Sequence, residues 1–84
     1  MDQSFCVVVR HKDERVRAII CDDFLSACAA QLGQLIGIPT SDARQMLTKE
    51  DVEKTKNAIV KTGKDRISNE DTEVYIFYIP RWES

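Results

Sequence analysis

The stretch that decides the fold is residues 72–79, TEVYIFYI, which ends in an unbroken run of apolar and aromatic side chains. β-branched and aromatic residues favour a strand, and Pro80 ends it because proline cannot donate to a sheet ladder. Alternate side chains of a strand point to opposite faces. Both faces are apolar here: one carries Val74, Ile76 and Tyr78, and the other carries Tyr75, Phe77 and Ile79. A sheet with one wet face alternates apolar and polar residues, so this strand predicts a sheet covered on both sides.

The N-terminal quarter of the chain predicts a hairpin that supplies two more strands. Residues 4–10 (SFCVVVR) and 15–21 (RVRAIIC) are rich in β-branched types, and the polar residues between them are few enough for a hairpin loop. Pairing residue 10 with residue 15 sets Val8 opposite Arg17 and Cys6 opposite Ile19. The loop contains no glycine that would fix its turn type, so this register rests on loop length alone.

A largely buried helix is predicted over residues 24–36 (FLSACAAQLGQLI), where apolar residues recur at helical spacing and few side chains are polar. Asp22 or Asp23 caps its start, since a carboxylate accepts the free backbone donors of a first helical turn. Gly37 stands where a left-handed C-terminal cap belongs. The small side chains along this helix would let another backbone approach closely.

Two more helices follow. Residues 41–47 predict a short helix capped by Ser41. A longer helix begins at Thr48, with Asp51 in the capping-box position, and runs to about residue 62. Its predicted inward side chains are Val52, Ile59 and Val60.

The resulting element order is β-β-α-(short α)-α-β, with residues 64–71 as a polar loop before the last strand. This order predicts an α+β fold with a three-stranded, mainly antiparallel sheet and helices packed on it. Eighty-four residues suffice for one core, so we expect a single domain over residues 1–84, with 79–84 as a C-terminal tail. The last strand takes either a central or an edge position.

Two arrangements would cover an apolar sheet of this kind on both faces. The helices divide between the faces, or a second molecule covers one of them. Four of the six aromatic residues lie near the C-terminus, and such side chains anchor protein interfaces. The candidate contact residues are Tyr75, Phe77, Ile79 and Trp82. The expected partner is another protein, a second copy of the chain, or both, and we expect a homodimer.

Residues 32–47 (LGQLIGIPTSDARQML) resemble the general helix-turn-helix pattern, with Gly33 at the helix crossing and Gly37 in the turn. Within residues 32–49 the candidate DNA-contacting residues are Ser41, Arg44, Gln45 and Lys49. Arginine and glutamine side chains can read guanine and adenine edges. Against this hypothesis, Asp42 lies on the same face, and the net charge of −2 gives weak phosphate anchoring. Two helices that simply meet at a Gly-Ile-Pro corner explain the same pattern.

No pattern of chemistry-bearing residues stands out. Cys6, Cys21 and Cys28 have no CxxC spacing, and the single histidine, His11, lies among charged residues. We therefore expect no metal site, no cofactor and no enzymatic activity. There is no Gly-rich phosphate loop either. The start of the sequence lacks a secretory signal, and no stretch is long enough to span a membrane, so a cytoplasmic location with reduced cysteines is expected.

These features favour a small, non-catalytic intracellular protein that binds another protein through an aromatic sheet face. An inhibitor, adaptor or regulatory subunit of a bacterium or phage fits this description. The alternative is a helix-turn-helix transcriptional regulator that uses residues 32–49.

Overall fold

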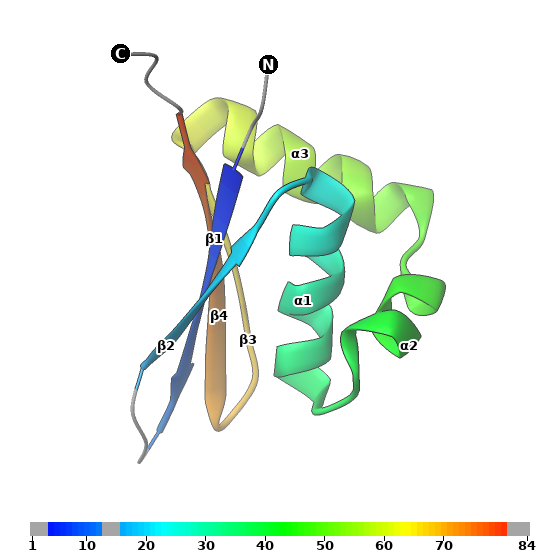
Figure 1. The fold of residues 1–84 in the computed structure, drawn as a ribbon, viewed down its shortest axis with the longest axis vertical. Coiled ribbons are helices and arrows are strands. Elements are labelled where there is room, and N and C mark those ends of the chain that lie inside the picture. Colours follow the sequence, from blue (N-terminus) through cyan, green and yellow to red (C-terminus); the bar gives the residue numbers. More distant parts are fainter. Residues whose placement is uncertain (1–3, 13–15, 81–84) are drawn as a thin grey trace.

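The computed structural model describes residues 4–12 and 16–80. Within these residues the elements are β1 (Ser4–His11), β2 (Arg17–Cys21), α1 (Phe24–Ile36), α2 (Thr40–Met46), α3 (Lys49–Thr62), β3 (Lys64–Ser68) and β4 (Thr72–Ile79). The strands form one antiparallel sheet in the order β2-β1-β4-β3, and the helices lie on one side of it (Figure 1). The α+β class is confirmed, and none of the helices covers the other side of the sheet.

The strand that decides the fold, β4, takes a central position between β1 and β3. Its side chains Val74 and Ile76 face the helices and lie opposite Val9 and Val7 of β1. All four of these side chains are fully buried. Burying one such aliphatic side chain contributes about 1.5–3 kcal/mol, so these four side chains are a major source of the stability of the fold.

The sheet has four strands rather than the three expected, because residues 64–68 form β3 and the prediction of a polar loop was wrong there. β3 pairs antiparallel with β4. Its turn is closed by Asn69, whose side-chain oxygen accepts hydrogen bonds from the backbone N–H groups of Asp71 and Thr72, both at 2.9 Å. The polar sequence of β3 does not by itself indicate a strand, and residues 64–68 form one because they pair with β4.

The predicted hairpin register was also wrong, by one residue. Val8 lies opposite Ala18, and Cys6 lies opposite Ile20. This register places Ile19 and Cys21 on the helix side, where they join the core. A slip of one residue turns every side chain of a strand to the other face, so the burial of these two side chains selects the observed pairing.

Helix α1 begins and ends as predicted. The Asp23 carboxylate accepts a hydrogen bond from the Ser26 backbone N–H at 2.7 Å, and Gly37 ends the helix with a left-handed φ of 77°. The face toward the sheet is lined by small side chains, including Ala27, Ala30 and Cys28, which are buried. Because these side chains are short, α1 packs closely against β1 and β4.

Helix α2 differs from its prediction at its start. It begins at Thr40 with Pro39 at the cap position and no side-chain capping bond, so the predicted Ser41 cap was wrong. The Pro39 carbonyl oxygen accepts hydrogen bonds from the backbone N–H groups of Asp42 and Ala43, at 3.1 and 3.0 Å.

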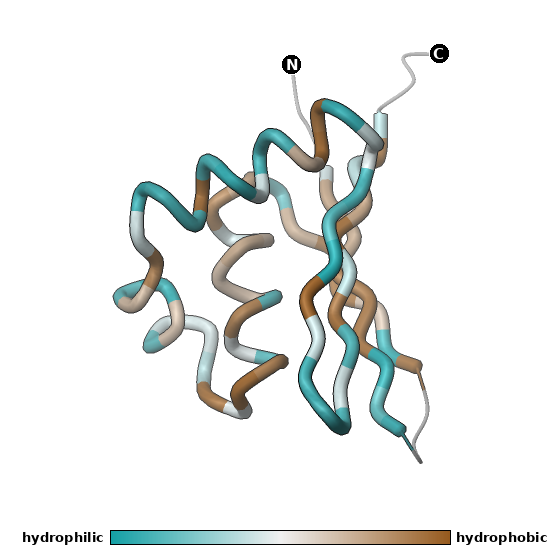
Figure 2. The backbone as a smooth tube through the Cα atoms, turned by 180° about the vertical axis from the view of Figure 1, so that it is seen from behind, coloured by the Kyte–Doolittle hydropathy of each residue, from teal (hydrophilic) through white to brown (hydrophobic). Residues whose placement is uncertain are grey.

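Helix α3 begins as predicted but is buried less than expected. Thr48 caps it by accepting a hydrogen bond from the Asp51 N–H at 3.1 Å. Val52 and Ile59 are half-buried, whereas Val60 is 79% exposed, so its predicted inward position was wrong. None of the α3 residues is fully buried, and Figure 2 shows a mostly hydrophilic α3 beside an apolar α1. No helix of the described residues is both long and apolar enough to cross a membrane.

Candidate functional site

The side of the sheet that faces away from the helices carries a continuous apolar surface, which we call the open sheet face. Alternation along the strands and the observed register place its apolar members on one side: Cys6, Val8, Ala18, Ile20, Tyr75, Phe77 and Ile79. Ala18 and Ile20 are exposed, and the others are half-buried by their neighbours within the face. Ile20, at 63% exposure, is the most exposed large apolar side chain in the strands, ahead of Tyr78 at 40% on the other face.

The aromatic centre of the open sheet face is ordered. The rings of Tyr75 and Phe77 stack with centroids 5.7 Å apart and an angle of 23° between their planes. The Tyr75 hydroxyl donates a hydrogen bond of 2.8 Å to Glu73, and the same carboxylate oxygen forms an ion pair with Arg66 at 3.1 Å. These two contacts, first the tyrosine hydroxyl and then the guanidinium, lower the pKa of Glu73. The exposed ion pair contributes little stability, but together the contacts hold the Tyr75 ring in place.

Three of the four predicted contact residues, Tyr75, Phe77 and Ile79, share this face. Trp82, the fourth, lies outside the described residues. The contributions of Ala18 and Ile20 were missed, because the wrong hairpin register turned these two side chains toward the helices. The alternation of Cys6 and Val8 in the first strand was the signal that the face extends beyond β4.

The predicted helix-turn-helix segment forms a tight corner between α1 and α2. A Cβ atom added at Gly33 would lie 2.8 Å from the Ile38 carbonyl oxygen and 3.5 Å from the Ala43 Cβ. The candidate DNA-contacting residues Ser41, Arg44, Gln45 and Lys49 are all exposed. Lys49 belongs to α3, so the corner presents only the seven residues of α2 as a reading helix, with Asp42 in its first turn.

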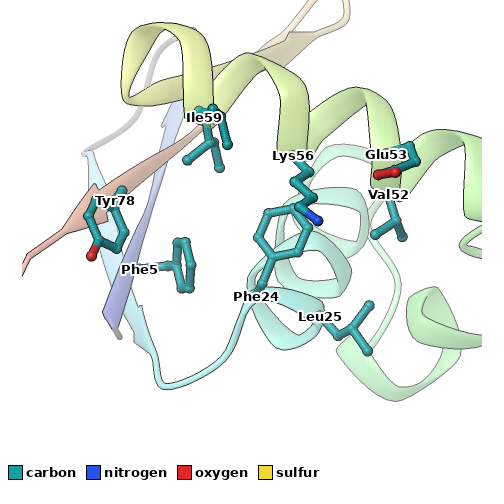
Figure 3. A pocket seen from close by; sticks show the side chains of 9 residues that line it. Phe5, Phe24, Leu25, Val52, Glu53, Lys56, Ile59 and Tyr78 are labelled. Atoms are coloured by element: carbon teal, nitrogen blue, oxygen red, sulfur yellow. The ribbon is translucent and has the colours of Figure 1, made fainter. Parts of the chain in front are cut away.

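On the helical side, an apolar hollow of about 690 Å³ opens between the end of the sheet, α1 and α3. Figure 3 shows the Phe5, Phe24 and Tyr78 rings on one side of it and Ile59 and Lys56 reaching down from α3. The Phe5 ring lies 5.6 Å from Phe24 and 5.7 Å from Tyr78, centroid to centroid, so the three rings form one wall. The sequence did not predict this hollow, because Val52, Ile59 and Val60 of α3 were expected to pack more deeply.

The thiols differ in their surroundings. Burial, followed by the nearby Asp65 carboxylate, raises the pKa of Cys28 to about 12. Burial, followed by the charge of Asp23, also raises the pKa of Cys21. Thiols with raised pKa values are poor nucleophiles, so these two act as apolar core residues.

Histidine and potential metal ligands are the other chemical groups of interest. His11 Nδ1 lies 3.0 Å from the Thr72 hydroxyl, across the pairing of β1 with β4. Across residues 4–12 and 16–80, no three histidine, cysteine or carboxylate side chains gather closely enough to hold a metal ion.

Neither protein-family models, nor curated proteins, nor solved structures give a match to this chain.

Proposed function

We propose that this chain is a non-catalytic protein-binding protein and that the open sheet face is its contact surface. The observation that carries this proposal is the position of the helices. All of them lie on one side of the sheet, while the opposite side carries seven apolar residues. Contiguous apolar surface left in water is unfavourable, and on soluble proteins it commonly marks an interaction site.

The size of the face suits a protein partner. The three strands that carry its apolar members have eight, five and eight residues, and a rise of about 3.4 Å with a spacing of about 4.8 Å gives them a plan area of about 340 Å². Exposed patches of this size on monomers are often functional. Two such faces stacked together approach the roughly 1,000 Å² that a specific interface needs, because side-chain relief adds to the plan area.

A second copy of the chain is the first partner to consider. Sheets that stack face to face keep their strands within about 30° and interdigitate apolar side chains, which is the chemistry this face offers. The stacked Tyr75 and Phe77 rings would lie at the centre of such an interface, where aromatic anchors contribute most. A different protein with a flat apolar surface would use the same anchors.

Ile20→Lys tests this proposal with little risk to folding, because the side chain is exposed in the monomer. Met46→Lys is the matched control, since Met46 is 55% exposed on the helical side. Light scattering over a concentration series should give twice the chain mass of 9.6 kDa for the wild type and for Met46→Lys. Ile20→Lys should give the monomer mass, with an unchanged circular dichroism spectrum.

If the wild type is a monomer, the same three proteins are used as baits in extracts of the source cells. A protein retained by the wild type and by Met46→Lys, but not by Ile20→Lys, would be the partner of the open sheet face. A monomeric wild type that retains no protein in this manner would contradict the proposal.

Nucleic acid is the second candidate partner. The α1–α2 corner with its exposed Arg44 and Gln45 favours duplex DNA, and the Tyr75–Phe77 stack favours single strands. A sequence pI of about 5.3 opposes both. Fluorescence anisotropy with labelled duplex and single-stranded probes at about 50 mM salt tests them together. Duplex binding that Arg44→Ala and Gln45→Ala weaken would assign the corner, and failure to bind either probe would remove this candidate.

A further inference from the structure

The hollow on the helical side continues into a second one, and the two form one groove along α3. The first, of about 690 Å³, and the second, of about 480 Å³, share Leu25, Val52 and Glu53 in their walls. We call the joined hollows the α1–α3 groove. Its apolar lining runs from the sheet end to the start of α3: Tyr78, Phe5, Phe24, Ile59, Val60, Leu25, Val52 and Leu47.

The groove exists because α3 touches the rest of the molecule only along a narrow stripe. Ile59 of α3 packs against the core near one end of the helix, Leu47 packs against it from the connection before the helix, and no α3 residue is fully buried. Leu25 remains 44% exposed on the opposite wall. Apolar walls on both sides of an open channel are a site where a further apolar element gains burial.

The length of the groove fits a helix. Its α3 wall runs from Lys49 to Val60, and at 1.5 Å per residue this span is about 16 Å, or three helical turns. A three-turn amphipathic helix presents apolar anchors at i, i+3 or i+4, and i+7, which would lie one after another along these walls.

The rim charge indicates which helix would fit. Three basic side chains, Arg44, Lys49 and Lys56, line the joined hollows, against the single acidic side chain of Glu53. Hydrogen bonds from Ser26 are the main cause of the lowered pKa of Asp23, and the nearby charge of Arg44 lowers it further, so Asp23 offsets part of the charge of Arg44. This basic rim contrasts with the net charge of −2 of the whole chain. Complementary charge therefore selects an acidic occupant.

We infer that the α1–α3 groove is a docking site for an acidic amphipathic helix of a partner protein. A second copy of this chain does not supply such a helix, because α1 is buried against the sheet and α2 has only seven residues. The remaining helix, α3, interleaves four lysines with three carboxylates and so offers no acidic face. The groove lies on the helical side, away from the open sheet face, and this inference does not depend on what covers that face.

The probe is a fluorescein-labelled helical peptide of sixteen residues, with leucines at positions 2, 5, 9 and 12 and glutamates on its polar face. A matched peptide carries lysines in place of the glutamates. Anisotropy titrations of the full chain should show the acidic peptide binding about tenfold or more tightly than the basic peptide, and raising the salt concentration should reduce this difference.

Variants of the chain locate the binding. Lys56→Glu reverses one rim charge and should weaken the acidic peptide several-fold while strengthening the basic one. Val60→Ser removes an exposed apolar wall residue and should weaken both peptides. Ile20→Lys, on the open sheet face, should change neither affinity. Circular dichroism shows whether each variant is folded.

Three results would overturn the inference. The two peptides bind equally well, Lys56→Glu leaves both affinities unchanged, or Ile20→Lys abolishes binding of the acidic peptide. Titration with dodecanoate in place of the peptide provides a further arm. Binding of dodecanoate by a chain that ignores the acidic peptide would assign the groove to a small anionic amphiphile and would likewise overturn the inference.

Discussion

Gly33 is the residue on which the joint between α1 and α2 depends. Its carbonyl oxygen accepts hydrogen bonds from the backbone N–H groups of Gly37 at 2.8 Å and Ile38 at 3.0 Å, which brings the chain back over its own helix end. The returning backbone leaves no room for a side chain, since an added Cβ would meet the Ile38 oxygen at 2.8 Å. The small size of glycine, rather than its backbone freedom, is what this position requires.

Gly33→Ala should therefore destabilise the protein by about 1–2 kcal/mol, although alanine is the better helix former, because the backbone has to shift to admit the methyl group. Urea unfolding followed by circular dichroism measures the loss. Ala29→Gly, in the same helix, is the control, because it measures how much the free energy of unfolding changes when glycine replaces alanine within α1. A Gly33→Ala variant as stable as the wild type would show that the backbone between α1 and α2 shifts to admit the methyl group at no cost in stability.

Glu73 gives the open sheet face a dependence on pH. Its pKa is lowered from 4.5, mainly by the Tyr75 hydroxyl and then by Arg66, so the folded state favours the ionised carboxylate. The contribution of the Glu73 carboxylate to the free energy of unfolding is therefore complete above pH 4.5, and it is lost as the pH falls through the lowered pKa of this group.

Carboxyl NMR across an acid titration should show Glu73 titrating below 4.5 in the wild type. Tyr75→Phe should move this pKa back toward 4.5, because it removes the strongest hydrogen bond and leaves the ring in place. A Glu73 pKa that is unchanged by Tyr75→Phe would mean that the hydroxyl does not hold the carboxylate in solution.

At the scale of the element, α3 is the helix whose stability depends most on its ends. It buries no residue fully, and helices with little tertiary packing depend on propensity and caps. The Thr48 hydroxyl accepts from the Asp51 N–H, and Gly63 closes the other end with a φ of 82°.

Thr48→Ala should cost about 1 kcal/mol and speed hydrogen exchange of the α3 amides, because the cap is lost from a weakly packed helix. Ser41→Ala is the matched control in α2, where no side chain caps the first turn. It should change the free energy of unfolding by no more than about 0.5 kcal/mol. Equal losses for the two variants would indicate that Ser41 caps α2 in solution.

The elements that the sequence predicted correctly are those whose signals are local. Residues 24–36 and the Thr48 start carry their caps and apolar spacing within a few residues, and both were confirmed. β3 was missed because only Ile67 among its residues KDRIS is apolar, and its strand character comes from pairing with β4. Propensity in a sheet depends on such neighbours, which are distant in sequence or unknown in advance.

The candidate site was predicted only in part: the apolar face of β4 was expected, whereas Ile20 and the α1–α3 groove were missed. Two apolar faces on one strand indicated a surface in need of cover, and that inference required only alternation along residues 72–79. The one-residue slip between Val8 and its partner in β2 could not be settled from loop length, and it hid Ile20. The α1–α3 groove was hidden for a different reason, since it depends on how far α3 stands from the sheet.

At the scale of the whole molecule, the one-sided placement of the helices gives the chain two apolar surfaces that point in opposite directions. The open sheet face is flat and centred on aromatic rings, whereas the α1–α3 groove is long and has a basic rim. The buried layer of Val7, Val9, Val74 and Ile76 lies between them. The two surfaces have no residue in common, so a partner on one of them makes no direct contact with the other.

If both proposals hold, the chain joins two partners, and each surface binds independently of the other. Cys6, half-buried on the open sheet face, reports on that face alone, because Cys21 and Cys28 are buried and their raised pKa values suppress the thiolate. In the folded protein iodoacetamide should therefore modify Cys6 first, and a partner on the open sheet face should slow this reaction. Saturation of the groove with the acidic peptide should leave the rate unchanged, as followed by mass spectrometry. Protection of Cys6 by the peptide would show instead that the surfaces are coupled, and the buried layer between them would then have to transmit the change.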